Sequence, residues 1–135
     1  MVEFTGEYEG ELHCRAVHGP SGQVLVTDAP KDNQGRGEAF SPTDLVATAL
    51  ATCMVTTMAI VARRHQVELS GLRFRATKEM AAYGPRRIAR IAVEFWMPPA
   101  AKKVPPGMLE AAANGCPVHH SLDPGLEKTV AFHWE

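Results

Sequence analysis

Two cysteine segments carry the residue types best suited to chemistry in this sequence. Cys53 lies within a long uncharged stretch, and Cys116 opens the segment 116–122, which reads Cys-Pro-Val-His-His-Ser-Leu. Pro117 suits the first position of a helix, so Cys116 would be its N-cap, where the positive end of the helix favours a thiolate. The pair therefore suggests thiol chemistry. Spacing alone leaves two alternatives open, plain burial for Cys53 and capping without chemistry for Cys116.

A reactive Cys53 needs a cation, and its own helix does not supply one at that position. The candidates are Arg36, in a glycine-rich loop, and Arg15, on the first predicted hairpin. A neighbouring cation lowers the pKa of a thiol and raises the thiolate fraction. Cys14 lies on an alternating strand, where we expect it to fill space and not to catalyse.

The histidines raise a metal-binding alternative. The densest cluster is Cys116 with His119 and His120, and Cys53 or His65 could be more distant ligands. A single Cys-x-x-His lacks the second pair that a structural zinc site needs, so we expect neither a metal nor another cofactor. The sequence also contains no glycine-rich phosphate loop, no G-x-S-x-G and no H-E-x-x-H, and these absences leave nucleotide binding, serine hydrolysis and zincin chemistry without support.

A long helix over 42–64 is expected to position Cys53. Ser41 suits the N-cap, Pro42 the first helical position, and Asp44 the acidic partner in a capping-box arrangement. The helix is apolar or small on nearly every side and so must be covered all round. We expect it to lie at the centre of an extensive homodimer interface; the alternative is a helix wrapped entirely by its own sheet and loops.

The remaining pattern predicts strands around this helix. Strands are expected at 3–8, 10–18 and 23–28, then a loop over 29–40, a hairpin of 72–77 with 88–97, a short helix over 107–114 and a last strand over 128–134. This order predicts an α+β fold, an antiparallel sheet with a long buried central helix. We expect one domain over residues 1–135.

Composition limits the function classes. The 135 residues carry a net charge of -1, which gives no basic surface for nucleic acid and no polybasic membrane patch. The uncharged stretch 45–62 reaches the lower length of a membrane span, but its four threonines and many alanines favour a buried helix. Acidic residues near the N-terminus do not fit a signal peptide, so we expect a cytoplasmic location and no structural disulfide framework.

The cysteine segments resemble those of the OsmC/Ohr family, named for osmotically inducible protein C and organic hydroperoxide resistance protein. The helix start 41–45 reads Ser-Pro-Thr-Asp-Leu, 49–53 reads Ala-Leu-Ala-Thr-Cys, and 116–122 is similar to the family's second-cysteine segment. The order of elements agrees along nearly the whole chain. The sequence looks most like the OsmC-like branch, and the family forms an intertwined homodimer with its sites at the interface.

The resemblance implies a thiol peroxidase. Cys53 would attack an organic hydroperoxide and become a sulfenic acid, Cys116 would condense with it to a disulfide, and a dithiol would reduce that disulfide. The activating arginine would be Arg36, with Arg15 in reserve. The family's glutamate, ten positions before the first cysteine, is replaced here by Thr43, and Asp44 follows one position later. The alternative is an OsmC-fold protein that binds a small ligand or responds to redox state without peroxidase turnover.

Overall fold

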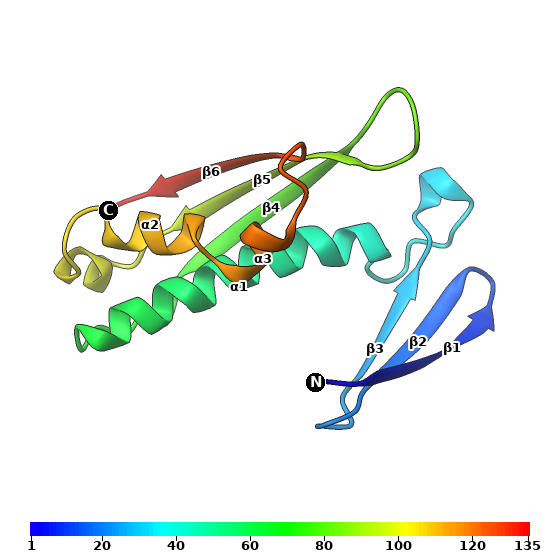
Figure 1. The fold of residues 1–135 in the computed structure, drawn as a ribbon, viewed down its shortest axis with the longest axis horizontal. Helices are drawn as coiled ribbons and strands as arrows, with labels where there is room; N and C mark the ends of the chain where they lie inside the picture. The colour runs from blue at the N-terminus through cyan, green and yellow to red at the C-terminus, as the bar shows by residue number, and fades with distance from the viewer. The chain divides into compact units, whose positions relative to one another are not determined.

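The computed structural model describes residues 1–135 and divides the chain into two compact units, Met1–Val46 and Ala47–Glu135. Figure 1 labels the strands and helices along the chain. The strands form two small sheets, and the chain also contains helices, so the α+β prediction is confirmed. The homodimer and the single-domain organisation stay predictions.

The first unit contains one three-stranded antiparallel sheet. Its strands are β1 (Phe4–Gly10), β2 (His13–His18) and β3 (Val24–Asp28), in the order β1-β2-β3. All three overlap the predicted ranges, although Gly10 ends β1 and residues 11–12 form a turn within the range predicted for the second strand. A single 3-10 turn, η1 (Lys31–Asn33), interrupts the loop that follows β3. In that loop a Cβ on Gly35 would stand 1.8 Å from the carbonyl oxygen of Ala29, so only glycine allows this close approach.

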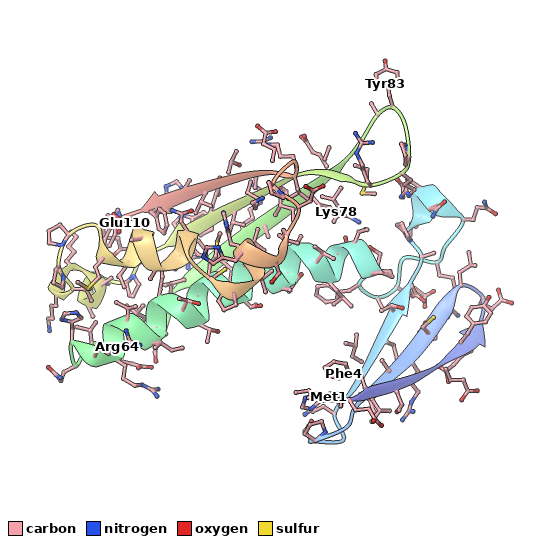
Figure 2. All side chains as sticks on the ribbon, viewed as in Figure 1. Met1, Phe4, Arg64, Lys78, Tyr83 and Glu110 are labelled. Atoms are coloured by element: carbon pink, nitrogen blue, oxygen red, sulfur yellow. The ribbon has the colours of Figure 1, made fainter.

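The second unit contains a sheet in the order β4-β5-β6, with β4 (Arg73–Met80), β5 (Ile88–Trp96) and β6 (Glu127–His133). The predicted antiparallel hairpin of β4 and β5 is confirmed, and Figure 2 shows Tyr83 at its tip. The prediction of antiparallel pairing throughout is wrong in one place, because β6 pairs parallel to β5. A long crossover through η2 (Pro99–Lys103), α2 (Met108–Asn114) and α3 (Pro117–Ser121) returns the chain to the end where β5 began.

The long helix α1 runs over Pro42–Arg64, the range expected from its cap and its basic end. The Ser41 N–H donates to Asp44 Oδ2 at 2.9 Å, and the Asp44 N–H donates to Ser41 Oγ at 3.0 Å. This reciprocal pair is a capping box, and it satisfies two N–H groups at the helix start that have no partner within the helix.

One face of α1 belongs to the core of the second unit. Its buried residues there are Ala47, Leu50, Ala51, Met54, Met58 and Ala62. Ile60 is 51% exposed, so the described chain does not cover the helix on every side. By length and composition α1 could cross a membrane, a test that the core helix of a soluble protein also passes.

Candidate functional site: a paired thiol centre

The structure brings Cys53 and Cys116 together within the second unit. Cys53 lies in the middle of α1 and is half-buried, whereas Cys116 is the N-cap of α3 and is fully buried. The two thiols interact, because a hydrogen bond with Cys53 is one of the causes that raise the pKa of Cys116. The two cysteines are free, so the pair is described in its reduced form.

The first turn of α3 donates one backbone N–H to each sulfur. The Val118 N–H donates to Cys53 Sγ at 3.5 Å, and the His119 N–H donates to Cys116 Sγ at 3.4 Å. Pro117 occupies the first helical position, where its missing N–H leaves no unpaired donor. Each sulfur therefore accepts a hydrogen bond from the backbone of this turn, and neither of these two donors is a charged side chain.

The environment of Cys116 differs from what its capping position suggests. The predicted N-cap is confirmed, but the expectation that this position favours a thiolate is wrong. Burial is the largest cause and raises the pKa of Cys116, whereas the His119 and Val118 N–H groups act in the opposite direction and do not offset it. The interaction with Cys53 also raises the pKa of Cys116. Cys116 therefore remains a protonated thiol at neutral pH and can donate its S–H toward the Cys53 sulfur.

His119 and His120 follow Cys116 in the short helix α3. The rings of His119 and His120 pack edge to face with centroids 6.2 Å apart. Burial, followed by the charges of Lys128 and His120, lowers the pKa of His119, so its imidazole is neutral at pH 7. His65 contacts Met108 Sδ at 3.1 Å through Nε2. Along residues 1–135 no three His, Cys, Asp or Glu side chains converge in a group that could hold a metal.

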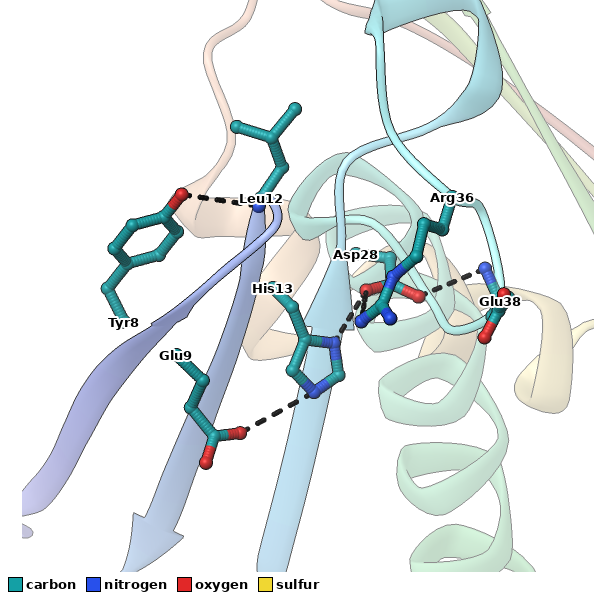
Figure 3. Close-up of polar contacts among 7 residues, drawn as sticks. All are labelled: Tyr8, Glu9, Leu12, His13, Asp28, Arg36 and Glu38. Atoms are coloured by element: carbon teal, nitrogen blue, oxygen red, sulfur yellow. Dashed lines mark hydrogen bonds and ion pairs between the residues drawn. The ribbon is translucent and has the colours of Figure 1, made fainter.

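Arg36 lies in the first unit, in a charged cluster around Asp28 (Figure 3). Asp28 is 1% exposed, and its Oδ1 lies 2.6 Å from His13 Nδ1 and 3.7 Å from Arg36 Nη2. The Glu38 N–H donates to Asp28 Oδ2 at 3.0 Å. The hydrogen bond with His13 is the largest cause that holds the pKa of Asp28 below its ordinary value, with smaller contributions from Glu38 and Arg36.

The other predicted site residues have simpler surroundings. Arg15 is exposed on β2, opposite Glu7 in the register of the sheet. Asp44 forms the capping box at the start of α1. Cys14 is exposed, as its alternating strand allowed.

Sequence reasoning missed two features of the site region. It did not find the Val118 N–H, although a residue two positions after an N-cap was the available signal. It also missed Asp28 and its partner His13, whose signal was an acid that closes an apolar strand just before a polar loop.

Comparison with known proteins shows which family the chain is similar to. The model of the family described as OsmC-like protein matches residues 35–130. The chain belongs to the OsmC-like family. A solved structure from Psychrobacter arcticus 273-4, named for an osmotic stress induced and detoxification response, is 38% identical, with a TM-score of 0.88 and coverage of 98% of this chain and 96% of that one.

More distant members share the fold. An organic hydroperoxide resistance protein OsmC from Legionella pneumophila is 14% identical, with a TM-score of 0.74 over 98% of this chain and 96% of that chain. An organic hydroperoxide resistance protein from Elizabethkingia anophelis is 13% identical, with a TM-score of 0.77 over 100% and 96%. No curated protein matches the sequence. The predicted family resemblance is therefore confirmed, and these two likenesses establish a common fold.

Proposed function

We propose that this OsmC-like protein is a cysteine-dependent peroxidase that reduces organic hydroperoxides in defence against oxidative stress. The observation that carries the proposal is the contact between two free thiols in unequal surroundings, Cys53 half-buried and Cys116 fully buried. Relatives of the same fold named as organic hydroperoxide resistance proteins give further support. The proposed substrate is a small organic hydroperoxide, and no cofactor is required.

In the first step the Cys53 thiolate attacks the terminal oxygen of the hydroperoxide. The S–O bond forms as the O–O bond breaks, so the sulfur is oxidised to a sulfenic acid and the alkoxide takes up a proton and leaves as the alcohol. The Val118 N–H donates to Cys53 Sγ at 3.5 Å and supports this assignment, because it places a hydrogen-bond donor at the attacking sulfur. Arg36 is the proposed activating cation, and Arg15 is the alternative.

In the second step Cys116 resolves the sulfenic acid. Its sulfur forms a bond to the Cys53 sulfur, the S–OH bond breaks, and the hydroxide combines with the Cys116 proton to give water. A protonated and buried Cys116 suits this role, since it is protected from peroxide until the partner sulfur is oxidised. A dithiol reductant then exchanges with the disulfide and restores both thiols.

We also propose that the protein is a homodimer and acts in the cytoplasm. The apolar face of the first sheet supports the dimer, since Phe4 is 64%, Tyr8 60% and Leu25 46% exposed. Directly opposed residues of neighbouring strands project from one face of a sheet, and the register places these three side chains on the same face. Exposed apolar surface of this kind favours burial against a partner.

Turnover of cumene hydroperoxide with a dithiol reductant tests the proposed function. Cys53→Ser is expected to abolish hydroperoxide consumption, and Cys116→Ser to permit the first oxidation while recycling poorly. Cys14→Ser is the matched control, because Cys14 has no role in the proposed thiol chemistry and serine changes its size little, so turnover is expected to be unchanged. If Cys53→Ser consumed the hydroperoxide at the wild-type rate, the proposal would be contradicted.

A second candidate function is small-ligand binding or redox sensing without turnover. It is favoured by Thr43, which stands where peroxidase relatives were expected to carry a glutamate, and by the capping-box bonds of Asp44. Native mass spectrometry that reveals a co-purified ligand, together with Cys53 that resists hydroperoxide, would support this candidate. Repeated turnover with a dithiol would remove it.

A further inference from the structure

Asp28 stands out among the acidic residues because it is the one charged side chain that the chain buries. Burial of a carboxylate is unfavourable unless hydrogen bonds and opposite charges compensate it. Each Asp28 oxygen has a partner: Oδ1 meets His13 and Arg36, and Oδ2 accepts from the Glu38 N–H. The proposed thiol chemistry assigns no role to this buried carboxylate.

The Asp28 carboxylate contacts residues on both sides of one turn in the loop after β3. Arg36 and Glu38, which it contacts, flank Gly37, whose φ of +61° lies in the left-handed region. A side chain at Gly37 would be strained there and would meet Lys31 at 2.9 Å. The Gly37 N–H donates to the Ala29 carbonyl at 3.2 Å, which ties the same turn back to the end of β3. The Arg36 backbone is thus held from two directions.

Asp28 is itself held from the neighbouring strand. His13 Nδ1 lies 2.6 Å from Asp28 Oδ1, and His13 Nε2 lies 3.6 Å from Glu9 Oε1 (Figure 3). Charged and polar side chains therefore run without a break from Glu9 on β1, through His13 on β2 and Asp28 on β3, to Arg36 in the loop. Such a chain orients the final group through the rigid sheet that carries the first three.

Arg36 keeps the capacity to act on a second anion. Its side chain is 46% exposed, and the ion pair with Asp28 is made by Nη2 at 3.7 Å. A guanidinium has five N–H donors in a fixed planar arrangement, so one partner leaves others available. Asp28 can therefore orient the group without neutralising every donor.

We propose that Asp28, held by His13, is the positioning residue for Arg36 and sets the orientation in which its guanidinium meets an anion. The proposal rests on the proposed function, in which Arg36 activates Cys53. Asp28 acts through Arg36 and does not touch the substrate, so its effect on chemistry disappears when Arg36 is removed.

A double-mutant cycle tests this dependence. The rate of Cys53 oxidation by cumene hydroperoxide is measured by quenched-flow mass spectrometry in wild type, Asp28→Asn, Arg36→Ala and the double variant. Asp28→Asn retains an oxygen for the Glu38 N–H but loses the charge, and it is expected to slow oxidation about tenfold. In the Arg36→Ala background, Asp28→Asn is expected to cause no further loss in the rate of Cys53 oxidation. An equal additional loss in that background would overturn the proposal.

Trypsin cleavage after Arg36 gives a readout that does not depend on peroxidase activity. Asp28→Asn and the milder His13→Gln are both expected to raise the rate of cleavage at this bond about fivefold, because the turn opens more often. Glu7→Gln, which removes an exposed acid from the same sheet, is the matched control and is expected to cleave at the wild-type rate.

The two readouts separate the possible failures. If wild-type Cys53 does not react, or if Arg36→Ala oxidises at the wild-type rate, the proposed function or its activating residue is wrong, and cleavage still tests the positioning. Unchanged cleavage in both Asp28→Asn and His13→Gln would overturn the positioning role. If Asp28→Asn fails to fold, His13→Gln replaces it in the cycle, because it leaves the Asp28 carboxylate and its bond to Glu38 in place.

Discussion

The two units of the chain differ in what they bury. The second unit encloses a core of apolar side chains from α1, β5, α2 and the segments between them, and Cys116 is part of that core. In the first unit the two buried side chains are Asp28 and Ser41, both of them polar. Hydrophobic burial therefore organises the second unit, whereas hydrogen bonds and ion pairs organise the first.

The buried charged cluster and the thiol pair therefore belong to different units of the chain. Burial, two backbone N–H groups and Cys53 set the pKa of Cys116, and no Lys, Arg, Asp or Glu side chain is among the causes. The guanidinium proposed as activator belongs to the other unit, where a buried carboxylate orients it. Cys116 is buried in the core of the second unit, whereas Arg36 belongs to a charged loop of the first.

Truncation in the core of the second unit gives the largest expected effect. Phe95 is fully buried and packs on Phe132 with ring centroids 5.5 Å apart. Phe95→Ala should lower the free energy of unfolding by about 3–5 kcal/mol, because it removes buried area and leaves a cavity. Phe74, its partner in the register on β4, is 42% exposed and provides the control. Equal losses in Phe95→Ala and Phe74→Ala, measured by urea denaturation, would contradict the assigned core.

A charge on the apolar face of the first sheet should dissociate the proposed homodimer. Leu25 lies on that face, so Leu25→Asp would place a carboxylate in the interface and shift the protein toward monomer. Light scattering after size-exclusion chromatography measures the mass. Thr5→Asp, on the opposite face, is expected to keep the wild-type mass. A Leu25→Asp protein with the wild-type dimer mass, or a monomeric wild type, would contradict this interface.

Removal of the N–H that faces Cys53 should slow the peroxide reaction. Val118→Pro deletes this donor, and proline is tolerated within the first turn of a helix. The expected loss is about tenfold in the rate of Cys53 oxidation, since a hydrogen bond to a charged sulfur is lost. Val118→Ala keeps the N–H and should oxidise near the wild-type rate. Similar rates in the two variants would assign no role to the backbone donor.

The pH dependence of stability should show the smallest effects, with opposite signs in the two units. The pKa of Asp28 is lowered in the folded state, so its contribution is present above the ordinary aspartate range, about pH 4, and is lost as pH falls through the lower folded value. The pKa of Cys116 is raised, so stability falls as pH rises above about 8.5. In a plot of the free energy of unfolding against pH, Asp28→Asn should weaken the fall at acid pH, and Cys116→Ala should weaken the fall at alkaline pH. An unchanged pH dependence in both variants would contradict these assignments.

Local signals in the sequence predicted most of the fold. The ends of α1 follow from the Ser41 cap and the basic residues at 63 and 64, and the β4 and β5 hairpin follows from alternation and its turn. The direction of β6 could not be predicted, because strand pairing depends on the path of the crossover and not on the residues of the strand.

The site was predictable in its residue types and less so in its electrostatics. The Cys116 N-cap followed from Pro117, but its raised pKa did not, since burial depends on residues distant in sequence that pack around it. The cluster around Asp28 joins residues from two strands and a loop. An acid at the end of an apolar strand is the local signal for Asp28, but its contacts with His13 and Arg36 depend on how the strands and the loop pack.

Intact mass after one equivalent of organic hydroperoxide shows whether Cys53 attacks the hydroperoxide and Cys116 resolves the product. Wild type is expected to lose about two mass units as the disulfide forms, and Cys116→Ser to gain the mass of about one oxygen as a sulfenic acid. Unchanged masses in both proteins would contradict the account and would leave an OsmC-like fold without peroxidase chemistry.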